Sequence, residues 1–203
     1  MSGIIAQNTL DNSGLIKAPA GGGGAWNFIA KQTASGDSDI SFTSGIDSTY
    51  KEYVFTFNNI HPSDDGETFT VNFRDGDTAY DAVKTTTSFR AYHDEADSAY
   101  GFAYVTSEDL AQGTGVQNIA NSGSDNDQSC AGYLHLFNPS STTFVKHFII
   151  RTSSAMYLDY INEWHIAGYC NTTTAIDGVQ FSFASGTIDA GDICLYGLTT
   201  WQE

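Results

Sequence analysis

The alternation of apolar and polar residues is clearest near the end of the sequence, between Ala175 and Leu198. Two runs there, residues 179–184 and 193–198, place an apolar residue at every second position. Period-two alternation is typical of a half-buried strand, because successive side chains of a strand point to opposite faces. The link between the runs contains Gly186 and Gly191, which favour a reversal of the chain. We therefore predict a closing pair of antiparallel strands.

The same texture recurs along most of the sequence. Strand-like runs rich in β-branched and aromatic residues are separated by turn residues such as those of 61–66 and 138–141, and the second of these links predicts a hairpin. About ten or eleven short strands without a long helix indicate an all-β protein, a single antiparallel β-sandwich of the jelly-roll-like kind. The runs are residues 25–32, 39–44, 50–60, 68–74, 83–93, 130–137, 143–152, 156–162, 164–170, 179–184 and 193–198, and residues 101–105 are one more short candidate.

Residues 106–129 interrupt this pattern. The stretch 107–112 predicts a single helical turn capped by Ser107, and residues 115–129 are polar enough to predict an exposed loop.

The first 24 residues differ in texture from the rest and predict an extended N-terminal arm and hinge, followed by one sandwich domain over residues 25–203. Apolar residues are scattered in the arm without a helical or strand period, and four consecutive glycines give it a flexible joint. A frayed terminus is one interpretation. The other is an arm that docks on this domain or on a neighbour. The residues concerned are Ile4, Ile5, Leu10, Leu15, Ile16, Gly21, Gly22, Gly23 and Gly24.

Charge narrows the classes of partner. The chain of 203 residues carries 24 acidic and 8 basic residues, a net charge of −16. Nucleic-acid binding needs clustered Lys and Arg, so we expect no nucleic-acid partner. No run of apolar residues is long enough to span a membrane, and the N-terminus lacks the features of a signal peptide. We expect synthesis in a reducing cytoplasm, with Cys130, Cys170 and Cys194 as free buried thiols, a Cys170–Cys194 disulfide being the alternative.

Candidate chemistry is sparse. Asp75, Asp77 and Asp81 lie close together, but the spacing of a calcium-binding EF-hand is absent. His135 and His147 flank the predicted hairpin turn, although nothing in their spacing requires them to converge on zinc. No nucleophile elbow, phosphate-binding loop or dinucleotide fingerprint occurs. We therefore predict a protein that is not an enzyme and that has no metal or other cofactor.

Aromatic residues in the second half of the sandwich suggest a sugar-stacking surface, although most of them are simply what strands contain. The residues of this predicted glycan surface are Tyr92, Tyr100, Tyr104, Tyr157, Tyr160 and Trp164.

The pattern G-V-Q-F-x-F-x-S-G-x-I-x-x-G-x-I-x-L-Y-G-L of residues 178–198 resembles a group of virion proteins of tailed bacteriophages, common in marine phages. Residues 133–151 and 1–28 resemble the same group. The resemblance implies a component of the phage particle and brings no catalytic residues. We expect a non-enzymatic structural protein on the particle exterior, a capsid decoration or cement protein, whose partners are its own copies and other virion proteins such as the major capsid protein. The alternative is a receptor-binding module of a tail fibre that holds host glycan.

Overall fold

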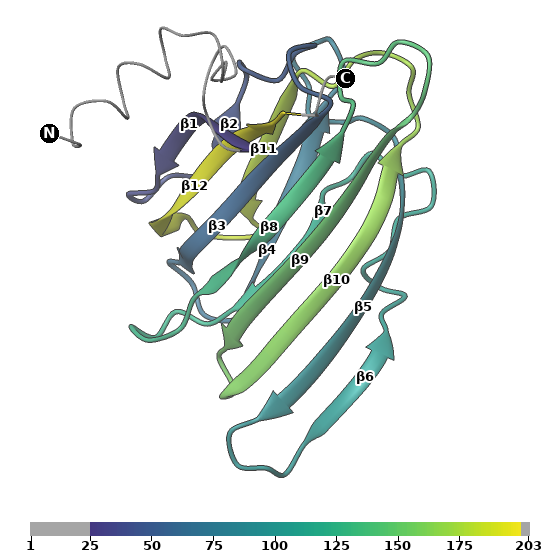
Figure 1. Cartoon of the computed structure of the whole chain (residues 1–203). Helices are drawn as coiled ribbons and strands as arrows, with labels where there is room; N and C mark the ends of the chain where they lie inside the picture. Colours follow the sequence, from purple (N-terminus) through teal and green to yellow (C-terminus); the bar gives the residue numbers. More distant parts are fainter. Residues whose placement is uncertain (1–24, 200–203) are drawn as a thin grey trace, which may run out of the picture.

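The computed structural model describes residues 25–199, which form twelve strands and no helix. The strands make two antiparallel sheets packed face to face (Figure 1). The large sheet has the order β1 (Trp26–Thr33), β12 (Ile188–Leu198), β3 (Glu52–Pro62), β8 (Cys130–Phe137), β9 (Lys146–Met156), β10 (Tyr160–Cys170), β5 (Lys84–Asp94) and β6 (Tyr100–Tyr104). The small sheet has the order β2 (Ile40–Phe42), β11 (Gly178–Phe183), β4 (Glu67–Arg74) and β7 (Gln117–Ser122). The predicted all-β sandwich is confirmed.

The core lies between the two sheets and is dominated by phenylalanine. Phe181 of β11 sits at its centre, with ring centroids 5.4 Å from Phe55, 5.2 Å from Phe57 and 5.9 Å from Phe69. Phe42 of β2 closes the cluster 6.4 Å from Phe181. These five rings come from both sheets, so the alternation of each strand is what brings them into one cluster.

The small sheet covers only part of the large one. Its last strand, β7, packs against β9 and β10, while β5 and β6 continue the large sheet past it (Figure 1). We call the face of the large sheet that packs on the small sheet the inner face, and the opposite one the outer face. Within residues 25–199, no second layer covers the outer face of the eight strands.

Most strand predictions match the structure, including the hairpin of β8 and β9 around Asn138. One prediction divided a single strand: residues 160–170 form the continuous β10, because Glu163 pairs in register with both neighbouring strands. The predicted turn at 61–66 is shorter than expected, since β3 runs on to Pro62.

The predicted helical turn at 107–112 is wrong, and the loop predicted at 115–129 is confirmed only for residues 123–129. Residues 107–112 form turns without a helix, and residues 117–122 form β7, an edge of the small sheet. The physical reason is that Gln117 is buried with its side-chain nitrogen hydrogen-bonded: Nε2 donates to the carbonyl oxygens of Glu108 and Asn118, both at 2.8 Å. A buried amide that bonds to the backbone is polar in the sequence, so a hydrophobicity pattern does not indicate the strand that contains it.

The closing pair of strands also differs from the prediction. β11 and β12 are both present, but β11 pairs with β2 and β4, whereas β12 pairs with β1 and β3. The Gly186-containing link therefore carries the chain from one sheet to the other. The expected N-terminal arm and its Gly21–Gly24 joint lie outside the described residues.

Candidate functional site

The outer face of the large sheet gathers side chains from every part of the chain. The strand registers align one continuous row across all eight strands, two residues apart from the rows on either side. From β1 to β6 this row consists of Lys31, Cys194, Thr56, Tyr133, Arg151, His165, Phe89 and Tyr104. Because neighbouring side chains in a row stand about 5 Å apart, they act as one surface.

One end of the outer face is an aromatic cluster on β1, β12 and β8. Tyr196 packs edge-on against Phe28 at 5.8 Å and against Trp26 at 5.4 Å, and Trp26 also meets the ring of His135 at 6.4 Å. Trp26 and Phe28 remain 47% and 62% exposed. Val54, which pairs with both Tyr196 and His135, is completely buried beneath these rings.

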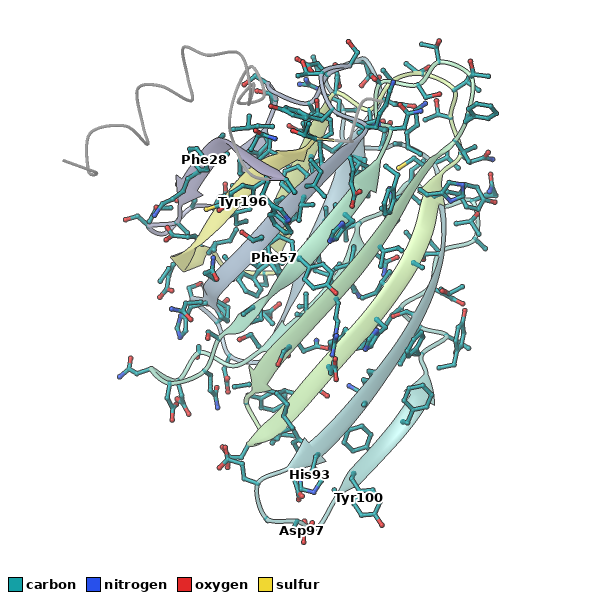
Figure 2. All side chains as sticks on the ribbon, viewed as in Figure 1. Phe28, Phe57, His93, Asp97, Tyr100 and Tyr196 are labelled. Atoms are coloured by element: carbon teal, nitrogen blue, oxygen red, sulfur yellow. The ribbon has the colours of Figure 1, made fainter. Side chains whose placement is uncertain are left out.

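A second aromatic cluster occupies the far end, on β10, β5 and β6. Phe89 stacks on His165 with ring centroids 5.0 Å apart and an interplanar angle of 3°, and it meets Phe102 at 5.4 Å. Tyr100 and Phe102 of β6 are 74% and 73% exposed, which is unusual for aromatic side chains. Figure 2 shows Phe28 and Tyr196 at one end of the sheet and Tyr100 at the other.

A polar group separates the two clusters. Glu163 of β10 accepts hydrogen bonds from the Arg151 guanidinium and lies 3.3 Å from His165 Nε2. The hydrogen bond from Arg151 is the main cause of a lowered pKa for Glu163, and the same bond raises the pKa of Arg151. This network fixes a guanidinium, a carboxylate and an imidazole side by side in the middle of the face.

Two hollows lie on the outer face beside this network. The first, of about 360 Å³, is lined by Ala131, Tyr133, Arg151, Ser153 and Glu163 among others. The second, of about 460 Å³, extends over the small side chain of Ala167 and is walled by Phe137, His147, Ile149, Tyr169, Thr85 and Thr87. Both exist because small residues interrupt rows of large ones.

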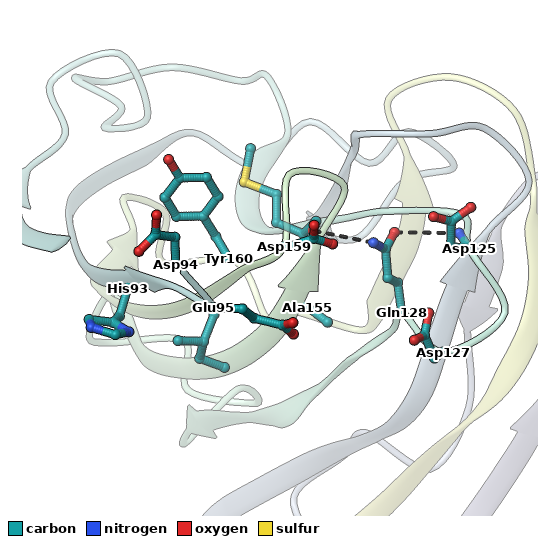
Figure 3. A pocket seen from close by; sticks show the side chains of 11 residues that line it. His93, Asp94, Glu95, Asp125, Asp127, Gln128, Ala155, Asp159 and Tyr160 are labelled. Carbon is teal, nitrogen blue, oxygen red and sulfur yellow. Dashed lines mark hydrogen bonds between the residues drawn. The ribbon is translucent and has the colours of Figure 1, made fainter. Parts of the chain in front are cut away.

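A third pocket, of about 370 Å³, lies at the tip of the molecule beside the β9–β10 turn (Figure 3). Asp94, Asp125, Asp127 and Asp159 line it. The carboxylate of Asp94 already accepts hydrogen bonds within the protein, from the Ser98 hydroxyl and from the backbone of Ala99 and Ser98. These hydrogen bonds lower its pKa.

Within residues 25–199, no group of three or more His, Cys, Asp or Glu side chains is arranged to hold a metal ion. His135 bonds to Glu52, while the row of His135 continues to Ile149 rather than to His147. Asp77 accepts a hydrogen bond from the backbone of Ala79 at 2.7 Å, as an ordinary turn residue does.

The predicted glycan surface is divided between the two faces of the sheet. Tyr92, Tyr160 and Trp164 belong to the inner-face rows, where Arg90 lies over the rings of Tyr92 and Trp164 at 5.4 and 5.3 Å. Tyr100 and Tyr104 stand on the outer face of β6, and Tyr157 lies in the turn after β9. The sheet therefore separates residues that the sequence suggested as one platform.

The residues that line the two hollows were missed at the level of sequence. Tyr133, Arg151, Glu163, Ala167 and Tyr169 occupy alternate positions of three strands, so their common face could have been predicted from parity alone. Their nearness depends on the order of the strands in the sheet, which the sequence pattern does not contain.

Two buried lysines and a buried cysteine lie side by side on the inner face, where β5 and β9 begin and β10 ends. Lys84, Cys170 and Lys146 are aligned cross-strand partners and all are completely buried. Burial lowers the pKa of Lys84 to about 8 and also lowers that of Lys146, while burial raises the pKa of Cys170 to about 12.

The two ammonium groups are satisfied by oxygen atoms of β4 and of loops. Lys84 Nζ donates to Asn72 Oδ1 at 2.5 Å and to the Ala82 carbonyl at 2.7 Å, and Lys146 Nζ donates to the Thr172 carbonyl at 2.9 Å. These contacts tie the loops to the sheet, which is a structural role.

The fold and its surface define an antiparallel β-sandwich with a broad, exposed, aromatic sheet face. Comparisons of the chain with protein-family models, with curated proteins and with solved structures find no significant match. Among residues 25–199, no helix is long and apolar enough to cross a membrane.

Proposed function

We propose that this chain is a non-enzymatic structural protein on the exterior of a tailed-bacteriophage particle, a capsid decoration protein. The observation that carries the proposal is the outer face of the large sheet, which presents exposed aromatic rings at both ends. Contiguous exposed apolar surface of this kind marks interaction sites in soluble proteins. The sequence resemblance to phage virion proteins supplies the biological setting.

The distribution of charge supports a contact role for this face. In the regularly paired parts of the strands, three carboxylates point outward. Glu163 and Asp192 form ion pairs with Arg151 and Lys31, and Glu52 is hydrogen-bonded to His135. Little of the net charge of −16 therefore lies on these strands. A face of low charge on an acidic protein reduces repulsion where a partner docks.

Among residues 25–199, the hydrogen bonds of the histidines show no paired nucleophile and base. Within the described residues, no serine, threonine or cysteine side chain bonds to a histidine ring, which is how many hydrolases activate a nucleophile. His61, His93 and His135 bond instead to the carboxylates of Asp189, Asp97 and Glu52.

The second candidate function is a receptor-binding module of a tail fibre, which is favoured by the two hollows beside the Arg151–Glu163–His165 network. Antibody labelling of intact particles distinguishes the two roles. Many copies distributed over the head support decoration, a few copies at the tail support receptor binding, and absence from purified particles refutes both.

The N-terminal arm provides a further test of decoration. Twenty extended residues span up to about 66 Å, so residues 1–20 can reach a neighbouring subunit. We expect deletion of residues 2–20 to leave the melting temperature of the isolated protein unchanged and to abolish incorporation into particles. Full occupancy of particles by the truncated protein would show that the arm has no part in assembly.

A further inference from the structure

The two outer-face hollows have the chemistry of a sugar-binding groove. From their lining residues we infer that the outer face binds an uncharged oligosaccharide, with one subsite in the hollow at Tyr133 and Arg151 and the other in the hollow over Ala167. This inference rests on the second candidate function and deepens it, because it names the class of glycan and the two subsites; its tests do not depend on whether the protein decorates a head or sits on a tail.

The size of the hollows fits this ligand. Their volumes of about 360 and 460 Å³ lie in the lower part of the range of ligand pockets, which is about 300–1,000 Å³. Along β9 the first hollow is centred on Thr152 and the second on Phe148, four residues away. At about 3.3 Å per residue, their centres lie about 13 Å apart. An oligosaccharide, but not a single sugar, can occupy both.

The lining combines the two contacts that sugars need. The apolar face of a pyranose ring packs on aromatic side chains, and each hollow has such a wall: Tyr133 in the first, Phe137 and Tyr169 in the second. Hydroxyl groups need planar polar partners of fixed orientation, and the ion pair of Arg151 and Glu163 supplies a donor and an acceptor at the wall of the first hollow.

Charge selects the class of glycan. Two of the three outward carboxylates on the paired strands form ion pairs with Arg151 and Lys31, while the chain as a whole carries −16. The surrounding negative potential repels phosphorylated, sulfated or uronic-acid glycans as they approach. A neutral glycan meets no such barrier, and the flat aromatic face suits it.

A second copy of the chain is the competing occupant of this face. Association through it would bring two molecules of charge −16 together. The glycan accounts for both the hollows and the low charge of the face.

The test uses the full-length protein and isothermal titration calorimetry with hexasaccharides of glucose, mannose and galactose, together with the matching disaccharides. An alginate hexasaccharide serves as the acidic comparison. We expect at least one neutral hexasaccharide to bind, its disaccharide to bind more weakly because it fills one hollow, and alginate not to bind.

Three variants locate the site. Tyr133→Ala and Tyr169→Ala each remove one aromatic wall and should weaken binding by about tenfold, the value of one aromatic contact with the apolar surface beneath it. Ala167→Trp fills the second hollow from an exposed position and should reduce hexasaccharide binding to the level of the disaccharide. Tyr157→Ala, an exposed aromatic away from both hollows, is the matched control and should bind like wild type.

Unchanged melting temperatures of the variants show that a loss of binding is local. Equal binding by wild type and all three hollow variants would overturn the inference, and so would preference for alginate or no binding to any neutral hexasaccharide. Sedimentation experiments test the second copy. If the protein dimerises with increasing concentration and Ala167→Trp abolishes this dimerisation, the face is assigned to a second copy. None of these outcomes depends on where particle labelling places the protein.

Discussion

Lys84 provides a sharp test of the interior, because its ammonium group is completely buried without a carboxylate bonded to it. Desolvation is the main cause of its lowered pKa, about 8 against the ordinary 10.5. Between these two values the unfolded chain holds a proton that the folded protein has released. Stability from this group therefore rises with pH across the window and is lowest below about pH 8, where both states are protonated.

The magnitude follows from the size of the shift. A difference of one pKa unit corresponds to about 1.4 kcal/mol, so the full effect of the Lys84 shift is about 3 kcal/mol. Between about pH 7 and pH 9, roughly 1 kcal/mol of this appears as added stability of the wild type. Cys170 does not disturb this interval in the folded protein, because its pKa is raised to about 12.

The substitution Lys84→Met isolates the effect. Methionine is similar in length and cannot titrate, and most of the oxygens that Lys84 leaves keep another donor: Asn72 Oδ1 accepts from the Phe73 amide at 2.9 Å, and the Thr114 carbonyl accepts from Asn72 Nδ2 at 3.2 Å. Subtracting the variant from the wild type cancels the titrating groups that do not interact with Lys84.

The assay is urea unfolding followed by tryptophan fluorescence, with unfolding free energies measured for both proteins from about pH 7 to pH 9. We expect the wild type to gain about 1 kcal/mol on the variant over this range. Lys51→Met, at an exposed position, is the matched control and should show no such trend. A difference between wild type and Lys84→Met that is flat, or that shrinks with pH, would refute a buried lysine with a lowered pKa.

Two further predictions concern the core and the thiols. Phe181→Ala removes the ring at the centre of the phenylalanine cluster and should lower the unfolding free energy by about 3–5 kcal/mol in the same urea assay, whereas Phe144→Ala, 69% exposed, should have little effect. The three free cysteines are buried, and burial raises the pKa of Cys130 and Cys170 to about 12; native protein should therefore react negligibly with a thiol reagent, while denatured protein titrates three thiols without prior reduction, and a lower count would indicate a disulfide.

The fold was predictable wherever one face of a strand is buried and the other is wet. β9 shows this best: from Lys146 to Ser154 its residues alternate between buried and exposed without a break. Register then follows from the requirement that the apolar set face the core. β7 was not predicted because its buried positions include Gln117 and Ser122, whose polarity predicts a loop until their backbone partners are known.

The destination of β12 was not predictable from local pattern. Alternation and the glycines of the preceding link are equally compatible with a hairpin and with a crossing between sheets. The structure has the crossing, because Ile193 and Leu195 complete the inner face of the large sheet between β1 and β3. Which sheet a strand joins depends on long-range packing rather than on its own sequence.

The candidate site on the outer face could not be predicted from the sequence, because it depends on the order of the strands. The exposed aromatic residues of this face also carry a risk of aggregation. Exposed aromatic residues on β6, an edge strand of the large sheet, are an aggregation hazard in most proteins. Here Glu95 and Asp97 lie in the turn between β5 and β6, and Asp109, which follows β6, accepts a hydrogen bond from Tyr104 at 2.5 Å. Acidic residues thus flank the strand at both ends and repel another copy of the same acidic chain, while the middle of the face carries little charge. Such an arrangement discourages self-association along the edge without charging the surface itself, which is what a face that must meet a different, uncharged partner requires.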